Sequence, residues 1–220
     1  MIAAALHTKE KRGKILIGFY NYTVILTYLS LFSSMVGMMF TVNGYFKTAL
    51  ACLAFSGLCD MFDGKVARRK KDRTEDEKNF GIQIDSLCDV ICFGAFPVLL
   101  AYRMGVNGFP GILILLWYGM NGVVRLGFFN VMETKRQEET DEVRKYYSGL
   151  PITSIAIILP LVCVTKPWIP CDFRLLLHCT MLIVGTLFVV NFKVRKPKNI
   201  TLAIFVAVVA LALLKIFHVF

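Results

Sequence analysis

Seven long apolar runs, separated by polar connections, make up most of the chain. Each run approaches the roughly 20 residues that a helix needs to cross the hydrocarbon core of a bilayer. Only helices can bury this much backbone in lipid without closing a barrel. The pattern therefore predicts an all-α fold, a polytopic transmembrane helical bundle of about seven spans. The predicted spans lie at about 16–40, 44–64, 82–103, 108–132, 149–166, 173–192 and 199–219.

The first 15 residues differ from the rest of the chain. They are basic and too short of apolar residues to cross a membrane, which favours a cytoplasmic or interfacial helix and no cleavable signal peptide. We find no internal repeat and no low-complexity tract. The sequence thus predicts an N-terminal segment over 1–15 and one transmembrane domain over 16–220.

Composition and charge agree with a membrane location. Hydrophobic residues make up 56% of the chain and the formal net charge is +10; the mean hydropathy of +0.62 lies outside the range of ordinary soluble domains. Basic residues gather at 9–14, 65–78, 135–145 and 193–198, which seven alternating spans place on one side. The positive-inside rule predicts that this side is the cytoplasm. Such charge favours anionic headgroups or lipid substrates as partners, and not nucleic acid.

Cysteine gives no sign of a metal or redox site. Seven cysteines are scattered mostly within the spans, with no CxxC pair and no matching histidine spacing. We interpret them as small apolar side chains.

Four aspartates inside the apolar runs are the most informative feature. Asp60 and Asp63 close the second span, and Asp85 and Asp89 open the third. One carboxylate at mid-membrane depth costs about 2.5–3.5 kcal/mol on insertion scales. Spacings of three and four residues put each pair on one face of its helix. Two antiparallel helices then bring all four together, and salt bridges or helix caps explain only one or two of them.

Divalent cations are the expected partners of such a cluster. Four close carboxylates repel one another unless cations neutralise them, and oxygen-only ligation favours Mg²⁺ or Mn²⁺ over zinc. Gly64, Ala67 and Gly81 leave room on the same faces for a ligand, and Arg68 adds a cation suited to phosphate.

These residues resemble the signature of the CDP-alcohol phosphotransferases. The match runs from Asp60-x2-Asp63-Gly64-x2-Ala67-Arg68 to Gly81-x3-Asp85-x3-Asp89, with a long gap of 12 residues between Arg68 and Gly81. The resemblance implies two metal ions held by the four aspartates, with Asp89 also the general base, and a CDP-lipid groove lined by the small residues and Arg68. Thr27, in a stretch similar to an early segment of the family, is expected to touch the diphosphate or to bond its own helix backbone. The resemblance also implies a six-helix core and a homodimer.

Three further stretches are similar to the phosphatidylserine synthase branch, which transfers a phosphatidyl group from CDP-diacylglycerol to L-serine in phospholipid biosynthesis. They are 80–97, 125–130 and 145–151; the second has Phe128 where the branch usually has arginine. Arg125 lies in an otherwise apolar span, where a carboxylate would be a suitable forked partner. We therefore expect the serine site to include Arg125, Asn130 and Lys145.

Alternatives to this interpretation remain open. Arg125 could instead pair with an aspartate or with helix carbonyls, and Lys145 could extend to the interface. A sister enzyme could use choline, glycerol phosphate or inositol phosphate as the alcohol, or an archaeal CDP-ether lipid as the donor. A small cation transporter also places aspartates within a membrane, but these aspartates cluster near one end of two helices and form no relay across it.

Overall fold

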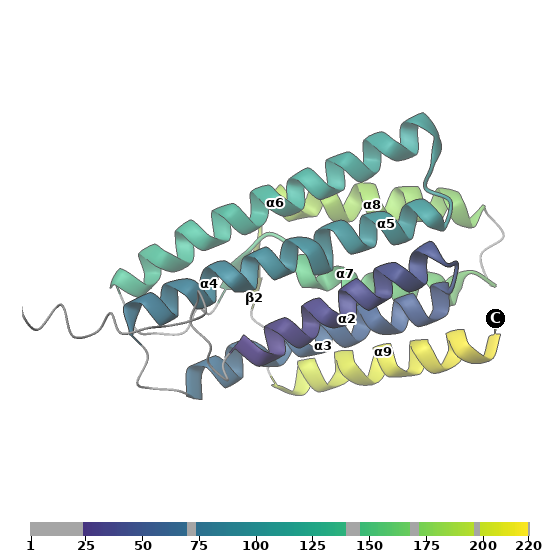
Figure 1. Cartoon of the computed structure of the whole chain (residues 1–220). Coiled ribbons are helices and arrows are strands. Elements are labelled where there is room, and N and C mark those ends of the chain that lie inside the picture. The colour runs from purple at the N-terminus through teal and green to yellow at the C-terminus, as the bar shows by residue number, and fades with distance from the viewer. Residues whose placement is uncertain (1–23, 70–73, 140–145, 168–171, 196–198, 220) are drawn as a thin grey trace, which may run out of the picture.

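The computed structural model describes residues 24–69, 74–139, 146–167, 172–195 and 199–219. Within these ranges the chain is a bundle of long helices that run alongside one another (Figure 1). Each of the seven predicted apolar runs contains a helix, which confirms the all-α prediction. The main helices are α2 (Ile25–Val42), α3 (Phe46–Arg69), α4 (Glu75–Asp89), α5 (Phe96–Arg103), α6 (Gly108–Glu139), α7 (Ile155–Thr165), α8 (Phe173–Val189) and α9 (Asn199–Val219).

Helix length differs among these segments. Within the described residues, four helical stretches are long and apolar enough to cross a membrane: Ile25–Val42, Glu75–Arg103, Gly108–Arg136 and Ile200–His218. The helices α7 and α8 are apolar but shorter. The helix α3 has 24 residues, yet its apolar run is interrupted by the aspartates.

Four short elements complete the described structure. A π-helical segment, η2 (Val90–Ala95), joins α4 to α5, and a 3-10 turn, η3 (Ile152–Ser154), precedes α7. The strands β1 (Tyr146–Ser148) and β2 (Lys193–Arg195) pair antiparallel. This ladder, which the all-α prediction lacks, ties the connection before α7 to the connection after α8.

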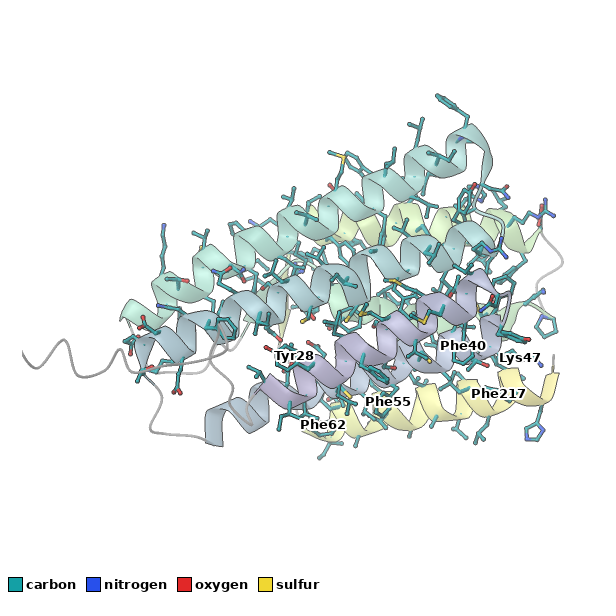
Figure 2. The ribbon with its side chains drawn as sticks, in the orientation of Figure 1. Tyr28, Phe40, Lys47, Phe55, Phe62 and Phe217 are labelled. Atoms are coloured by element: carbon teal, nitrogen blue, oxygen red, sulfur yellow. The ribbon has the colours of Figure 1, made fainter. Side chains whose placement is uncertain are left out.

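The helix α2 presents small and polar residues to the bundle and large apolar ones outward. Its buried residues include Thr27, Ser30, Ser34, Gly37 and Thr41, spaced alternately by three and four. Such residues let helix backbones approach closely in a membrane, where hydroxyls also bond across helices. On the neighbouring helix α3, large apolar side chains also lie on the surface of the bundle, among them Phe55 and Phe62, which are labelled in Figure 2.

A seam of serines joins α2 to α3. Ser56 of α3 lies 2.6 Å from Ser30 and 2.9 Å from Ser34, measured between hydroxyl oxygens. Ser33 donates to the carbonyl oxygen of Cys52 at 3.0 Å. These bonds satisfy buried hydroxyls and fix α2 against the helix that carries Asp60 and Asp63.

Two helices extend beyond their predicted ends. The predicted spans begin at about 82 and end at about 132, but α4 already begins at Glu75 and α6 continues to Glu139. A capping box between Thr74 and Glu77 starts α4. Glutamate–cation pairs three residues apart, of the kind that stabilise exposed helix turns, support both extensions: Glu75–Lys78 and Glu133–Arg136.

Basic residues gather where α3 ends and α4 begins. The C-terminal end of α6, the strand β2 and the start of α9 lie at that same end of the bundle (Figure 1). The other end carries fewer cations, Lys47, Arg103, Lys166, Arg174 and Lys215, near the termini of α3, α5, α7, α8 and α9. The charge asymmetry that the sequence predicts is therefore present, although the second end is not free of cations.

Close packing of α3 on α7 gives a stability prediction. A methyl group added at Gly57 would lie 2.6 Å from the Cβ of Ala156, and both backbones belong to packed helices. We expect Gly57→Ala to lower the free energy of unfolding by about 1–3 kcal/mol, because overpacking forces helices apart. The measurement is the thermal unfolding of the detergent-purified protein.

The matched control is Gly127→Ala on α6. An added methyl group there meets nothing within 4 Å, so this variant should be as stable as the original chain or more so. Equal stability of the Gly57 and Gly127 variants would contradict the packing described here.

Candidate active site

The carboxylates of α3 and α4 meet, as the sequence predicts. Asp60, Asp85 and Asp89 each offer one carboxylate oxygen, and these three atoms lie within 4.8 Å of one another. Asp63 lies beside these three residues, close enough to Asp60 and Asp85 for the carboxylates to repel one another. The carboxylates of α3 and α4 thus face one another, and Asp63 is only 8% exposed.

This donor set suits a divalent cation. Every candidate ligand atom is a carboxylate oxygen, the donor that Mg²⁺ and Mn²⁺ prefer. Carboxylates this close repel one another unless a cation or a proton lies between them. The four aspartates therefore fit the predicted metal ions, and the same residues would hold them.

Thr27 reaches the cluster from α2. Its hydroxyl donates to Oδ2 of Asp63 at 3.3 Å, and the side chain is buried. Of the two expectations for Thr27, a bond to its own helix backbone four residues back would involve residue 23, which lies outside the described residues, so it stays a prediction. A contact with the diphosphate stays a prediction, and the observed role is to orient Asp63.

The residues predicted to line the CDP-lipid groove lie on the same two helices. Gly64 directly follows Asp63 on α3, and Gly81 precedes Asp85 by one helical turn on α4; both are partly buried. Ala67 and Arg68 belong to the last turns of α3, but their side chains lie outside the described part of the chain.

Arg125 is buried on α6, at 8% exposure. Its Nη1 donates to the carbonyl oxygens of Ser148 at 2.6 Å and Phe188 at 3.3 Å. Gly149 has a φ of +71°, and a methyl group on it would lie 2.9 Å from that nitrogen. One alternative given for Arg125, a pairing with backbone carbonyls, is thus present. This pairing joins α6 to β1 and α8. Contact between Arg125 and serine stays a prediction.

Asn130 lies closer to the carboxylates than its sequence position suggests. The hydroxyl of Ser86, the residue after Asp85, donates to Oδ1 of Asn130 at 2.6 Å. This bond connects α6 to the helix that carries Asp85. Lys145, the third residue predicted for serine, lies outside the described residues.

Sequence reasoning missed several residues that support the site. Ser86 lies inside the aspartate motif, but sequence spacing alone does not show that it bonds Asn130, 44 residues away on α6. The serine seam had a visible signal, the alternation of three and four residues between Thr27 and Thr41.

Comparison with known proteins gives a family and a set of relatives. The model of the CDP-alcohol phosphatidyltransferase family matches residues 20–190. The chain is 30% identical over 153 residues to the CDP-diacylglycerol–serine O-phosphatidyltransferase of Saccharomyces cerevisiae, an alignment that covers 66% of this chain and 54% of the relative. It is 31% identical over 144 residues to the protein of that name in Helicobacter pylori strain 26695, covering 64% and 56%.

An archaeal relative widens the group. The archaetidylserine synthase of Methanothermobacter thermautotrophicus is 31% identical over 136 residues, covering 61% of this chain and 54% of the relative. The chain spans about half the length of the curated relatives it matches. With helices long enough to cross a membrane and a family match over most of its length, this chain is an integral membrane protein that belongs to the CDP-alcohol phosphatidyltransferase family.

Proposed function

We propose that the chain is a phosphatidylserine synthase, which transfers the phosphatidyl group of CDP-diacylglycerol to the hydroxyl of L-serine and releases CMP. The observation that carries the proposal is the meeting of four carboxylates from α3 and α4 in one cluster. Membership of the CDP-alcohol phosphatidyltransferase family restricts the reaction expected at this cluster to phosphoryl chemistry on a CDP-activated alcohol.

Asp89 has the role of general base. The serine hydroxyl gives its proton to the Asp89 carboxylate as its oxygen bonds to the β-phosphorus, and the bond from that phosphorus to the CMP oxygen breaks. Divalent ions, when bound by the aspartates, supply positive charge that offsets the charge of the diphosphate. Asp60, Asp63 and Asp85 have the role of ligands, and Thr27 keeps Asp63 oriented.

The CDP-lipid groove is proposed along the α3 and α4 faces that carry the aspartates. Gly64 and Gly81 have no side chains to block the approach of a nucleotide to the helix backbones. Arg68, five residues after Asp63, adds positive charge for phosphate, and Ala67 keeps the same face open. A groove here lets the lipid tails stay in the leaflet.

Serine is better supported as the acceptor than diacylglycerol is as the lipid. The names of the yeast and bacterial relatives contain serine and diacylglycerol, whereas the archaeal relative is an archaetidylserine synthase. Among these relatives the serine is constant and the lipid varies. The serine contacts that we propose are Arg125, Asn130 and Lys145, with Asn130 next to the carboxylates through Ser86.

The active site is proposed to face the cytoplasm. The aspartates lie toward the end of the bundle where α3 meets α4, which is also the more basic end. The positive-inside rule puts that end on the cytoplasmic side, where the soluble substrate serine is present and the product CMP can leave.

A panel of acceptors tests the substrate. Purified protein is incubated with CDP-diacylglycerol, Mg²⁺ or Mn²⁺, and labelled serine, choline, glycerol 3-phosphate or inositol phosphate. We expect labelled lipid from serine alone, and none when EDTA removes the metal. Lipid product from another alcohol but not from serine would refute the serine assignment and leave only the family. A parallel arm with a CDP-ether lipid distinguishes the two donors.

The general-base role predicts the effect of Asp89→Asn. Asparagine keeps the size of the side chain but cannot accept the proton, so turnover should fall by about a hundredfold or more while the CDP-lipid still binds. Steady-state rates and CDP-lipid binding are the measurements. The control is Asp76→Asn, the same change at an exposed position on the same helix, which should retain activity. A near-normal rate for Asp89→Asn would exclude the role.

A further inference from the structure

The π-helical segment η2 begins one residue after Asp89. The amide of Val90 still bonds the carbonyl of Ser86, four residues back, as in an α-helix. The amide of Phe96 instead bonds the carbonyl of Ile91, five residues back. The turn thus contains an additional residue, and such turns are common at functional sites.

The wider turn sets the direction of the aspartates relative to α5. Successive side chains of an α-helix are about 100° apart around the axis. One additional residue therefore rotates α4, which carries the aspartates, by that angle relative to α5. The helix runs without interruption from Glu75 to Arg103 (Figure 1). The faces of Asp85 and Asp89 therefore depend on this turn as well as on the packing of α5.

Pro97 favours the wider turn. A residue at position 97 of a regular α-helix would donate its amide to the carbonyl of Phe93, but proline has no amide hydrogen. A carbonyl left without a partner inside a membrane protein costs several kcal/mol. The Phe93 carbonyl therefore lacks its α-helical donor.

Tyr118 of α6 supplies a donor instead. Its hydroxyl donates to the Phe93 carbonyl at 2.7 Å, and the side chain is fully buried. The ring is fixed by α8: its centroid lies 5.2 Å from that of Phe188. A methyl group on Gly185 would lie 2.8 Å from the Cα of Tyr118. Little freedom is left for the hydroxyl to move away.

We infer that Tyr118 and Pro97 act together as positioning residues for the metal site: Pro97 frees the Phe93 carbonyl, the Tyr118 hydroxyl binds it, and the π-turn so maintained points Asp85 and Asp89 at α3. The inference rests on the proposed metal site, and it assigns Tyr118 no contact with substrate. Metal affinity should therefore depend on a tyrosine hydroxyl one helix away from the carboxylates.

Mn²⁺ binding and thermal unfolding test the inference without substrate. The free Mn²⁺ signal in electron paramagnetic resonance gives the Kd for the full-length protein in detergent. We expect Tyr118→Phe to raise the Kd about fivefold or more and to lower the metal-free Tm, because a buried carbonyl loses its donor. The control is Trp117→Phe, which removes a bond to Thr186 of α8 and should change the Kd less than about twofold.

Pro97→Ala separates positioning from stability. Alanine restores the amide donor to the Phe93 carbonyl and allows a regular α-turn. In Tyr118→Phe/Pro97→Ala the Tm should recover while the Mn²⁺ Kd stays high, and Pro97→Ala alone should weaken Mn²⁺ binding without lowering the Tm. Recovery of the Kd in the double variant, or equal effects of the Tyr118 and Trp117 changes on the Kd, would overturn the inference. A failure to make phosphatidylserine would instead refute the serine proposal and leave these binding results unaffected.

Discussion

Four carboxylates inside apolar helices can be tolerated only if they face one another around positive charge. A membrane solvates an isolated carboxylate poorly, and the penalty grows with each one added. In this chain the penalty is limited because the aspartates of α3 and α4 share a single cluster. The positions of the neighbouring helices are consequences of that requirement, since each contributes a contact that keeps the two faces opposed.

The supporting contacts are polar and small, not large and apolar. The serine seam holds α2 against α3 and lets Thr27 reach Asp63. On the other side, Ser86 bonds Asn130 of α6. Helices in lipid gain little from burying apolar surface against one another, so close approach and hydrogen bonds determine which faces meet. The site is thus fixed from two sides by short side chains that bulkier residues could not replace.

Arg125 shows how a buried cation can be structural. It binds the carbonyl oxygens of Ser148, the last residue of β1, and of Phe188, in the last turn of α8. Its guanidinium supplies donors that those buried carbonyls need. The proposed serine contact would add to that role.

Much of this architecture could be predicted from the sequence. Hydrophobic run lengths located all seven helical segments, and the spacing of Asp60, Asp63, Asp85 and Asp89 predicted the cluster, because helical periodicity acts over a few residues. Hydrophobicity does not predict the start of α4 at Glu75, because the first turn is polar and a capping box between Thr74 and Glu77 begins the helix there. The Arg125 partners, the Ser86–Asn130 bond and the π-turn depend on residues far apart in the chain, and no local pattern determines which of them meet.

Anomalous X-ray diffraction from crystals grown with Mn²⁺ would locate metal ions bound by the aspartates. We expect anomalous peaks between α3 and α4, within coordination distance of Asp60, Asp63, Asp85 and Asp89. Well-ordered carboxylates with no peak between them at saturating Mn²⁺, or Mn²⁺ bound only by other residues, would contradict this expectation.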